Sequence, residues 1–438
     1  MSFFLHGVNV PHRKNTQDQP AIRLTDVKTV TIPMLMHIGA PAVPTVKVGD
    51  AVYVGTKIAE DQSRVCAPIH SSVSGTVTKI TEVLISTGAK VPAVTIESDG
   101  QMTPDASIVA PTVTNKEELV SAIRASGVVG LGGAGFPTHV KWAVDPAKVD
   151  ELVINGAECE PYITSDSLTM VERAEDIKTA LEAFKAYFNL KNIIIGIENN
   201  KAKAIESMNA VAAEIGGVTV KVLPSLYPQG GEKVLVYHTT GKVIPTGKLP
   251  LDVGCIVCNC TTVAAIGSYL KTGMPLVKKC ITVDGGSVAS PANVIAPIGT
   301  SLADVFAACG GFKEDPHKVL YGGPMMGVAV PSLDLPVLKN TNAILALTKK
   351  EATPPKTTAC IRCGACINSC PFGLAPAEIS RAYKKKDADA LKNLAVDACM
   401  LCGSCSFICP ANRPLTETNN LAKKLLREVK EKEATKNG

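Results

Sequence analysis

The sequence CIRCGACINSCP at residues 360–371 is followed by CMLCGSCSFICP at residues 399–410, with the same cysteine spacing. Both stretches read C-x2-C-x2-C-x3-C-P, so three sulfurs can converge from one loop before a proline turns the chain away. This doubled pattern is typical of proteins with two 4Fe-4S clusters, in which the fourth cysteine of each run ligates the other cluster. The sequence therefore predicts two clusters with crossed ligand sets. One set is Cys360, Cys363, Cys366 and Cys409, and the other is Cys399, Cys402, Cys405 and Cys370.

Zinc and disulfide bonds are the alternatives for these cysteines. Four-thiolate zinc sites also use C-x2-C pairs, but two of them would not need eight ligands in doubled triplets. Tight triplets suit a metal better than cross-links, and no secretory signal precedes them. Among the other cysteines, Cys255, Cys258 and Cys260 are close enough to suggest a third metal site. Because no fourth ligand follows at an obvious spacing, they are better explained as buried small apolar side chains.

The composition is that of a packed globular protein. Of the 438 residues 46% are hydrophobic and 19% charged, which allows roughly three or four domains and argues against disorder. The net charge of +5 favours an acidic partner such as a ferredoxin and is far from a nucleic-acid signature. The sequence contains no run of 18 apolar residues, so it predicts no membrane span, and residues 1–25 lack the apolar core of a signal peptide. A reducing cytoplasm is the expected compartment for cluster thiolates.

The first hundred residues predict an extended segment, 1–25, and an all-β domain, 26–100. The second stretch alternates apolar and polar residues, is rich in Val, Ile and Thr, and is punctuated by Gly and Pro, which indicates short strands. Two units, VKVGDAVYVGTKIAE and APIHSSVSGTVTKI, resemble the halves of a barrel-sandwich hybrid domain. Carrier domains of that architecture attach a prosthetic group to a lysine at a hairpin tip. Here the tip holds His70, Ser71 and Ser72, so a structural or docking role is expected.

The remaining chain predicts three further parts. Residues 101–250 alternate strand and helix patterns, as in ELVINGAE, MVERAEDIKTALEAFKAYF and NIIIGIE, which indicates βαβ crossovers and a parallel sheet. Residues 251–345 read as a small β-grasp domain with one helix at LADVFAAC. The Pro-containing stretch KKEATPPKTT is a linker into an α-helical ferredoxin domain at 346–438. The final stretch, NLAKKLLREVKEKEATKNG, is interpreted as a solvated helical tail rather than a lipid or partner contact.

A second chemical signal is the glycine-rich stretch GVVGLGGAGFPTHVKW at residues 127–142. Its glycines permit positive φ and close backbone approach, so successive N–H groups can face a phosphate or a flat ring, and Lys141 can neutralise a phosphate. The stretch is neither a Walker A loop nor a Rossmann fingerprint. On glycine content alone, a tight connecting turn is an equal alternative.

Four motifs carry a resemblance to a known family. They are GLGGAGFPTHVKW, NGAECEPY at 155–162, YPQGGEK at 227–233 and NCTT at 259–262, and they resemble the flavin and nicotinamide site of the complex I flavoprotein subunit. With the opening GVNVPHRK, the barrel-sandwich segment and the two cysteine runs, nearly the whole chain resembles the RnfC family. Its members are NADH-handling subunits of Rnf complexes, the membrane ferredoxin:NAD oxidoreductases that pump sodium ions or protons. The resemblance implies a multidomain α/β chain with a barrel-sandwich hybrid, a Rossmann-like FMN domain, an SLBB-like β-grasp domain and a two-cluster ferredoxin domain.

The resemblance also implies residue roles. Glu158 and Glu160 are the expected catalytic groups, although buried carboxylates satisfied by loop amides are an alternative. Leu131, Ala157 and Gly231 stand where the complex I pattern has Arg, Asp and the first of two Glu. The residues expected around FMN are Gly130, Gly132, Gly133, Gly135, Lys141, Asn155, Glu158, Tyr227, Gly230 and Asn259, and those expected to hold the nicotinamide nucleotide are Phe136, Glu160 and Glu232.

These features predict an NAD-linked oxidoreductase. A nicotinamide passes two electrons as hydride and each 4Fe-4S cluster accepts one, so a flavin is needed between them. The implied partners are Rnf-type membrane subunits and a ferredoxin-binding iron-sulfur subunit, which would place the chain peripherally on the cytoplasmic face of the cell membrane. Two alternatives stay open. One is the related cobalamin reductase of propanediol-degrading microcompartments, and the other is a polyferredoxin adaptor without flavin activity.

Overall fold

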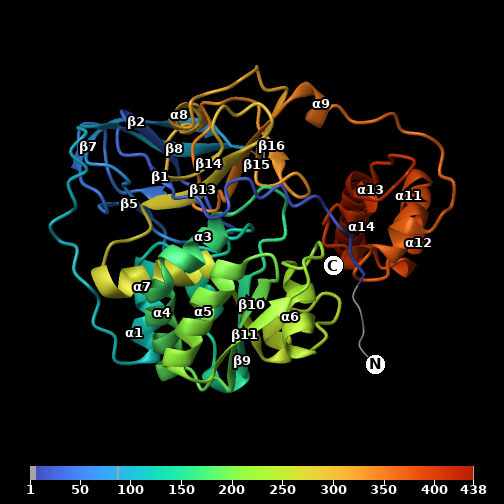
Figure 1. Cartoon of the computed structure of the whole chain (residues 1–438), viewed down its shortest axis with the longest axis horizontal. Coiled ribbons are helices and arrows are strands. Elements are labelled where there is room, and N and C mark those ends of the chain that lie inside the picture. Colours follow the sequence, from blue (N-terminus) through green and yellow to red (C-terminus); the bar gives the residue numbers. More distant parts are fainter. Residues whose placement is uncertain (1–5, 86–87, 438) are drawn as a thin grey trace.

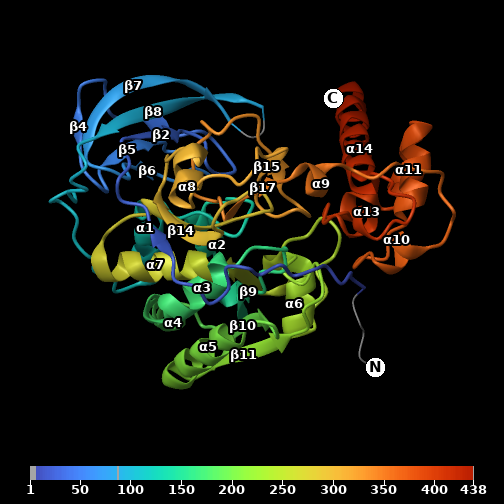
Figure 2. The same cartoon turned by 45° about the horizontal axis from the view of Figure 1, so that its top comes forward.

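The computed structural model describes residues 6–85 and 88–437 (Figure 1). The barrel-sandwich strands and the β-grasp sheet lie side by side above the α/β domain, and the helical cluster domain stands at one side (Figures 1 and 2). All four predicted parts are present in chain order, which confirms the predicted fold class. Within the described residues, no helix combines the length and the apolar character that a membrane span requires.

The barrel-sandwich domain consists of two small sheets. Val30 and Ile32 are fully buried while Thr29 is exposed, because successive strand residues face opposite sides of a sheet. The hairpin tip at His70 is also buried, and Ser72 Oγ donates to the carbonyl of Ile298, 2.5 Å away in the β-grasp domain. The tip therefore docks on a neighbouring domain. One sheet has the order β2 (Thr29–Pro33), β8 (Lys90–Ser98), β7 (Gly75–Leu84) and β4 (Ala51–Val52), and the other β3 (Val43–Pro44), β5 (Lys57–Glu60) and β6 (Ile69–His70).

The α/β domain is built on a four-stranded parallel sheet. Its strands follow the order β11 (Val218–Leu223), β10 (Asn192–Glu198), β9 (Glu151–Gly156) and β12 (Cys255–Asn259). One face packs against α1 (Lys116–Ala125), α4 (Ala174–Tyr187), α5 (Ala202–Ile215) and α7 (Cys260–Thr272), and the other against α6 (Glu232–Thr240). Helices on both faces explain why β10 reads as a nearly continuous apolar run.

The sheet extends beyond the predicted boundary at residue 250. β12 pairs with β9 and leads directly into α7, so residues 255–272 belong to the α/β domain instead of the β-grasp domain. The reason is that β12 comes from a crossover after α6 and is only five residues long, which leaves a weak sequence signal. Cys255 and Cys258 are buried in β12 and belong to the packed clusters on opposite faces of the sheet.

The β-grasp sheet receives one strand from the N-terminal segment. β1 (Ile22–Arg23) pairs in parallel with β14 (Ala292–Pro297), although 268 residues or more separate them in the chain. The predicted helix at LADVFAAC is α8 (Leu302–Ala308), and its Val305 and Phe306 are buried against the sheet. The other strands, in sheet order after β14, are β13 (Lys278–Asp284), β17 (Ala343–Leu347), β15 (Lys318–Tyr321) and β16 (Val328–Ala329).

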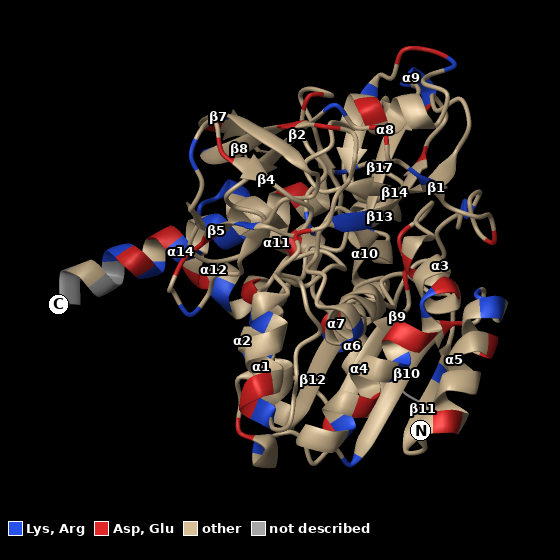
Figure 3. Ribbon diagram, turned by 90° about the vertical axis from the view of Figure 1, so that its left-hand side faces the viewer, with Lys and Arg blue, Asp and Glu red and all other residues tan. Residues whose placement is uncertain are grey.

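The C-terminal domain is helical as predicted, but its central stretch is two helices. α11 (Pro376–Lys384) ends before Lys386, whose φ of 53° cannot continue a helix, and Asp387 then caps α12 (Ala388–Asn393) by accepting from Ala390 N. α14 (Leu415–Asn437) is only in part the solvated tail that was expected. Its first half buries Ala422 and Leu426 against α11 and α12, whereas the far end projects with alternating charges (Figure 3). The domain also contains α10 (Ala365–Asn368) and α13 (Ser404–Phe407), and α9 (Lys349–Ala352) precedes it.

Candidate functional site

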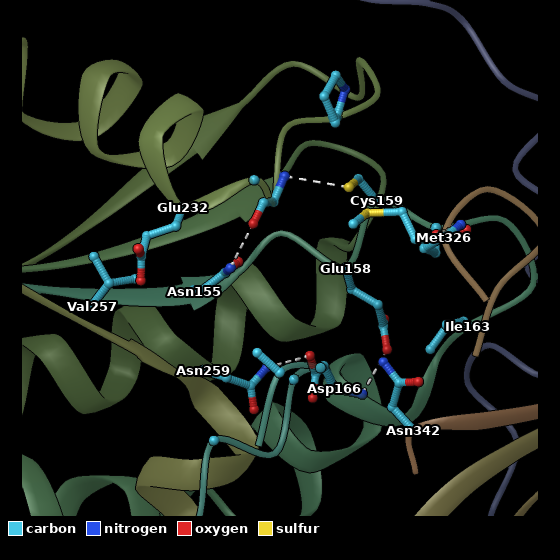
Figure 4. A pocket seen from close by; sticks show the side chains of 18 of the residues that line it. Asn155, Glu158, Cys159, Ile163, Asp166, Glu232, Val257, Asn259, Met326 and Asn342 are labelled. Carbon is cyan, nitrogen blue, oxygen red and sulfur yellow. Dashed lines mark hydrogen bonds between the residues drawn. The ribbon is translucent and has the colours of Figure 1, made fainter. Parts of the chain in front are cut away.

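A cavity of about 360 Å³ lies at the carboxyl ends of β9 and β12. Loops at this edge of a parallel sheet converge on bound ligands in α/β proteins. Asn155 comes from the end of β9 and Asn259 from the end of β12, and both point into the cavity (Figure 4). Its volume is within the range of roughly 300–1,000 Å³ that small-molecule sites occupy.

All thirteen predicted flavin and nicotinamide residues line this one cavity. They come from the glycine loop, the loop after β9, the Tyr227 loop, the start of α6 and the end of β12. The sequence motifs had pointed to these residues separately, and the fold brings them together. The lining residues that the sequence had not singled out as binding residues are Ala134, Cys159, Ile163, Asp166, Pro228, Gly231, Val257, Met326, Asn342 and Met400.

The missed residues fall into two kinds. Cys159 lies inside the motif NGAECEPY and Asp166 follows it closely, so that motif could have found them. Met326 and Asn342 belong to the β-grasp domain and Met400 to the cluster domain. No local pattern connects these three side chains with the glycine loop, because tertiary packing alone brings their domains to the cavity.

The glycine loop is held in a fixed shape over Asn259. A Cβ atom at Gly132 would lie 2.8 Å from Asn259 Nδ2, closer than side-chain atoms approach, so this position requires glycine. Gly130 N donates to the carbonyl of Phe136 at 2.8 Å, and Leu131 N donates to Thr262 Oγ1 at 2.9 Å. Asn340 Nδ2 donates to the carbonyl of Gly133 at 2.7 Å. The glycine loop is therefore the tight connecting turn that the sequence allowed as an alternative, and it also forms one wall of the cavity.

Lys141 brings a positive charge to the same wall. It lies on α2 (Thr138–Trp142), and its Nζ donates to the carbonyl of Val257 at 3.0 Å and is 3.9 Å from the carboxylate of Glu232. An ammonium beside glycine backbone N–H groups is a suitable environment for a phosphate.

Glu158 is half-buried at the wall of the cavity, on a loop with unusual backbone geometry. Its φ is 49°, in the left-handed region that non-glycine residues seldom adopt. The carboxylate accepts from Asp166 N at 2.6 Å and Ser167 N at 3.2 Å, and burial raises its pKa to about 7 against the attraction of Lys14. Asn259 Nδ2 donates to the carboxylate of Asp166 at 2.6 Å, so polar contacts connect Glu158, through Asp166, with the end of β12 (Figure 4).

Glu160 has a similar environment at the β-grasp side of the cavity. Its carboxylate accepts from the backbone N–H groups of Met325, at 3.1 Å, and Met326, at 2.8 Å. Burial raises its pKa to about 7 as well. Backbone N–H groups thus donate hydrogen bonds to both glutamate carboxylates, which is the alternative to a catalytic role that the sequence left open. Both glutamates also line the cavity.

The cavity continues directly to the cluster domain. Met400 lies between two of the predicted cluster cysteines, and it lines both the large cavity and the cavity that those cysteines surround. Tyr227 OH donates to the carbonyl of Cys402 at 2.6 Å, and Tyr227 and Cys402 belong to one packed apolar cluster. The two sites are therefore neighbours, with no domain between them.

The eight cysteines surround two separate cavities in the crossed arrangement. No group of three or more His, Cys, Asp or Glu in the described part of the chain is arranged to hold a single metal ion. Cys360, Cys363, Cys366 and Cys409 line one cavity, and Cys370, Cys399, Cys402 and Cys405 line the other.

The two cysteine cavities differ in their surroundings. We call the one around Cys402 the inner cluster site and the one around Cys360 the outer cluster site. At the inner site Cys402 and Cys405 are buried, and Asn419 Nδ2 donates to Cys399 Sγ at 3.6 Å. At the outer site Cys360 is exposed to solvent.

Comparison with protein families matches the four parts of the chain in order. Residues 2–101 match the RnfC barrel sandwich hybrid domain, and residues 123–268 match the Nuo51 FMN-binding domain. Residues 280–329 match the SLBB domain, and residues 356–413 match a 4Fe-4S dicluster domain. These matches confirm FMN and two 4Fe-4S clusters as the predicted cofactors.

Curated relatives cover most of the chain. The C subunit of the proton-translocating ferredoxin:NAD(+) oxidoreductase complex of Clostridium ljungdahlii is 41% identical over 84% of this chain and 81% of the relative. The C subunit of the Na(+)-translocating complex of Acetobacterium woodii is 40% identical over 90% of both chains. The C subunit of the ion-translocating oxidoreductase complex of Rhodobacter capsulatus is 40% identical over 91% of this chain and 78% of the relative. The chain therefore belongs to the RnfC family, the C subunits of ion-translocating ferredoxin:NAD(+) oxidoreductase complexes.

Proposed function

We propose that this chain is the NAD-linked electron-transfer subunit of an ion-translocating ferredoxin:NAD(+) oxidoreductase complex. FMN occupies the cavity of about 360 Å³, and the two cluster sites relay single electrons to or from partner subunits. The observation that carries this proposal is the shared lining residue Met400, which puts the inner cluster site next to the cavity of the predicted flavin residues.

The residues present are suited to FMN. Bound FMN supplies two-electron exchange with NAD(H) and one-electron exchange with the clusters. The N–H groups of the glycine loop and Lys141 bind the phosphate end, while Asn155, Tyr227 and Asn259 orient the flavin from the strand ends and the Tyr227 loop. Glu160, with a pKa near 7, can hold or release a proton at its carboxyl oxygen close to neutral pH.

The two cluster sites act in series. The inner site exchanges electrons with the flavin cavity through the contact at Met400, and the outer site exchanges them with the partner because Cys360 and Cys363 reach the surface. Arg362 and Arg413 line the outer site, and Ile361 beside them is 67% exposed. A basic and apolar surface of this kind suits an acidic iron-sulfur partner.

The proposal extends to partners and location, and the surface around the outer site supports its choice of partner. The outer site docks on a ferredoxin-binding iron-sulfur subunit, and membrane subunits of the same complex hold the chain peripherally on the cytoplasmic face of the cell membrane. The net charge of +5 supports attraction to an acidic partner. Net electron flow runs from reduced ferredoxin to NAD+.

Anaerobic purification followed by reduction with NADH tests the proposal. We expect one FMN and about eight irons per chain, with NADH bleaching both flavin and cluster absorbance. About eight irons without flavin, and no bleaching, would instead identify a polyferredoxin adaptor. Co-purification with membrane subunits, rather than with cobalamin-handling proteins, separates the Rnf assignment from the cobalamin reductase.

A further inference from the structure

The N-terminal segment crosses the molecule between its domains. Residues 7–16, here called the strap, contain the opening motif GVNVPHRK and run from the cluster domain past the α/β domain, after which the chain continues to β1 (Figure 1). Val8 and Val10 pack with Tyr227 and Cys402 at the cluster end. Nothing in the flavin or cluster chemistry described above uses this motif, yet its residues lie against three domains.

Lys14 of the strap is inserted into the loop that carries both cavity glutamates. Its Nζ donates to the backbone carbonyls of Glu158 at 2.8 Å, Glu160 at 2.9 Å and Ile163 at 2.5 Å. A neutral amine has only two N–H donors, so three carbonyl acceptors require the ammonium. Burial lowers the pKa of Lys14, and the neighbouring Glu158 opposes that effect.

The loop around Lys14 has a strained backbone. Glu158 has a φ of 49° and Tyr162 a φ of 71°, and such positive φ values at non-glycine residues persist only where surrounding contacts enforce them. Lys14 Nζ is the shared donor at three backbone carbonyls of this loop, and its removal would take those three hydrogen bonds away together. The ammonium is therefore a strong restraint on the loop.

Other strap contacts fix Lys14 in place. Tyr162 N donates to the carbonyl of His12 at 2.9 Å, and Thr16 Oγ1 lies 2.5 Å from Thr164 Oγ1. Arg13 donates to Tyr162 OH at 2.7 Å. Together with the bond from Lys14 to Ile163, these bonds join the strap to the loop at residues 162 to 164.

We propose that Lys14 is a positioning residue of the flavin site, and that its ammonium holds the Glu158–Ile163 loop in the conformation that places Glu158 and Glu160 at the cavity. This inference rests on the proposed function, because the loop matters to catalysis only if the cavity binds flavin and nicotinamide. Lys14 itself does not line the cavity and acts through the loop.

The test compares Lys14→Met with Lys28→Met in the anaerobically purified full chain. Lys28 is an exposed lysine with an ordinary environment, so it controls for loss of one positive charge. In Lys14→Met we expect the amides of residues 156–163 to exchange hydrogen at least about tenfold faster and FMN to bind about tenfold more weakly. Iron content should stay at the wild-type level, and in flavin-loaded protein KM for NADH should rise more than kcat falls. Lys28→Met should match the wild type in every measurement.

Lys14→Gln provides a second variant that keeps side-chain donors but removes the charge. It should show the same exchange and binding changes to a smaller extent. Wild-type exchange rates and FMN affinity in both Lys14 variants would overturn the proposal. So would insolubility of both variants, or equal loss of iron and flavin, because Lys14 would then support the whole fold rather than the loop.

The hydrogen-exchange measurement also separates this proposal from the proposed function. If the wild-type chain bound no FMN, the flavin assignment would fail. Faster exchange at residues 156–163 in Lys14→Met alone would still establish the restraint on the loop, and unchanged exchange would refute it.

Discussion

Glu160 links the site to pH through one buried carboxyl group. Burial raises its pKa from an ordinary value of 4.5 to about 7, so the folded protein favours the protonated form. The stability linked to this shift is fully present below pH 4.5 and is lost as the pH rises through about 7. We expect the melting temperature of the wild type to fall across this window more steeply than that of Glu160→Gln. Across this window the free energy of unfolding of the wild type should fall by at most about 3 kcal/mol more than that of Glu160→Gln, because one pKa unit corresponds to about 1.4 kcal/mol.

Thermal unfolding of both proteins at a series of pH values provides the measurement. Gln keeps the shape of the side chain and does not titrate, but its single amide oxygen can accept from only one of Met325 N and Met326 N, so it loses one hydrogen bond at every pH. Parallel curves for the two proteins would show that Glu160 ionises normally in the fold.

Lys141 contributes a charge where the phosphate of FMN is expected. Its ammonium lies at the cavity wall and is paired only weakly with Glu232, at 3.9 Å. We expect Lys141→Ala to weaken FMN binding by roughly tenfold or more, since hydrogen bonds to charged groups contribute about 1.5–3 kcal/mol. Iron content should not change. Flavin titration and iron analysis give the measurement, and the exposed Lys148→Ala is the matched control; equal FMN affinity in both variants would remove Lys141 from the site.

The residues that sequence motifs can identify are those with a local constraint. Gly132 is restricted by Asn259, and Asn155 and Asn259 end neighbouring strands, so each leaves a recognisable pattern. Lys14 and Met400 also lie in motifs, but the motifs do not indicate their contacts, because Lys14 acts on residues more than 140 positions away and Met400 reaches the cavity through the packing of domains.

At the scale of elements, each cysteine run places its fourth cysteine at the cavity of the other run. α10 and α13 each contain the third cysteine of a triplet and contact each other, which brings Cys370 to the cavity of the second run. We expect Cys370→Ala to lose about four of the eight irons, and NADH should then bleach no cluster, because the inner site is the one beside the flavin. Cys366→Ala should lose a similar amount of iron but leave one cluster reducible by NADH. A cluster that NADH still reduces in Cys370→Ala would contradict the crossed ligation or the order of the sites.

Element prediction succeeded where a pattern was long and failed where pairing was distant. The apolar run NIIIGIE could be read directly, and it forms β10. β1 and β12 were missed because two-residue and five-residue strands carry little periodicity, and only their partners β14 and β9 define them. The break between α11 and α12 depends on the backbone conformation of Lys386. The spacing of apolar residues in the sequence does not predict that conformation.

At the scale of the whole molecule, four domains share one site. The α/β domain supplies strand ends, the β-grasp domain supplies Met326 and Asn342, and the cluster domain supplies Met400. Ile38 N of the barrel-sandwich domain donates to the carbonyl of Gly135 in the glycine loop at 3.1 Å. The flavin cavity is therefore an interdomain site, and a fragment with the α/β domain alone would lack part of its wall.

The outer cluster site is the solvent-facing end of this arrangement. In the proposed direction of flow, electrons from the partner enter where Cys360 and Cys363 are exposed, beside Ile361 and Ile367, which are 67% and 40% exposed, and continue to the flavin cavity. Replacing either isoleucine with Glu puts a negative charge on the proposed docking surface. Docking of a partner would then have to remove water from the new carboxylate. We expect Ile361→Glu to slow electron exchange with a small acidic ferredoxin by about tenfold, as like charges across an interface reduce association.

The reaction of NADH with ferricyanide provides the internal control, because a small acceptor does not need the docking surface. Its rate should be unchanged in Ile361→Glu, and raising the salt concentration should narrow the difference in the ferredoxin reaction. Val243→Glu introduces the same charge at a site that is 69% exposed in the α/β domain. If Val243→Glu slowed the ferredoxin reaction as much as Ile361→Glu does, net charge alone would explain the effect, and the outer site would not be the point of docking.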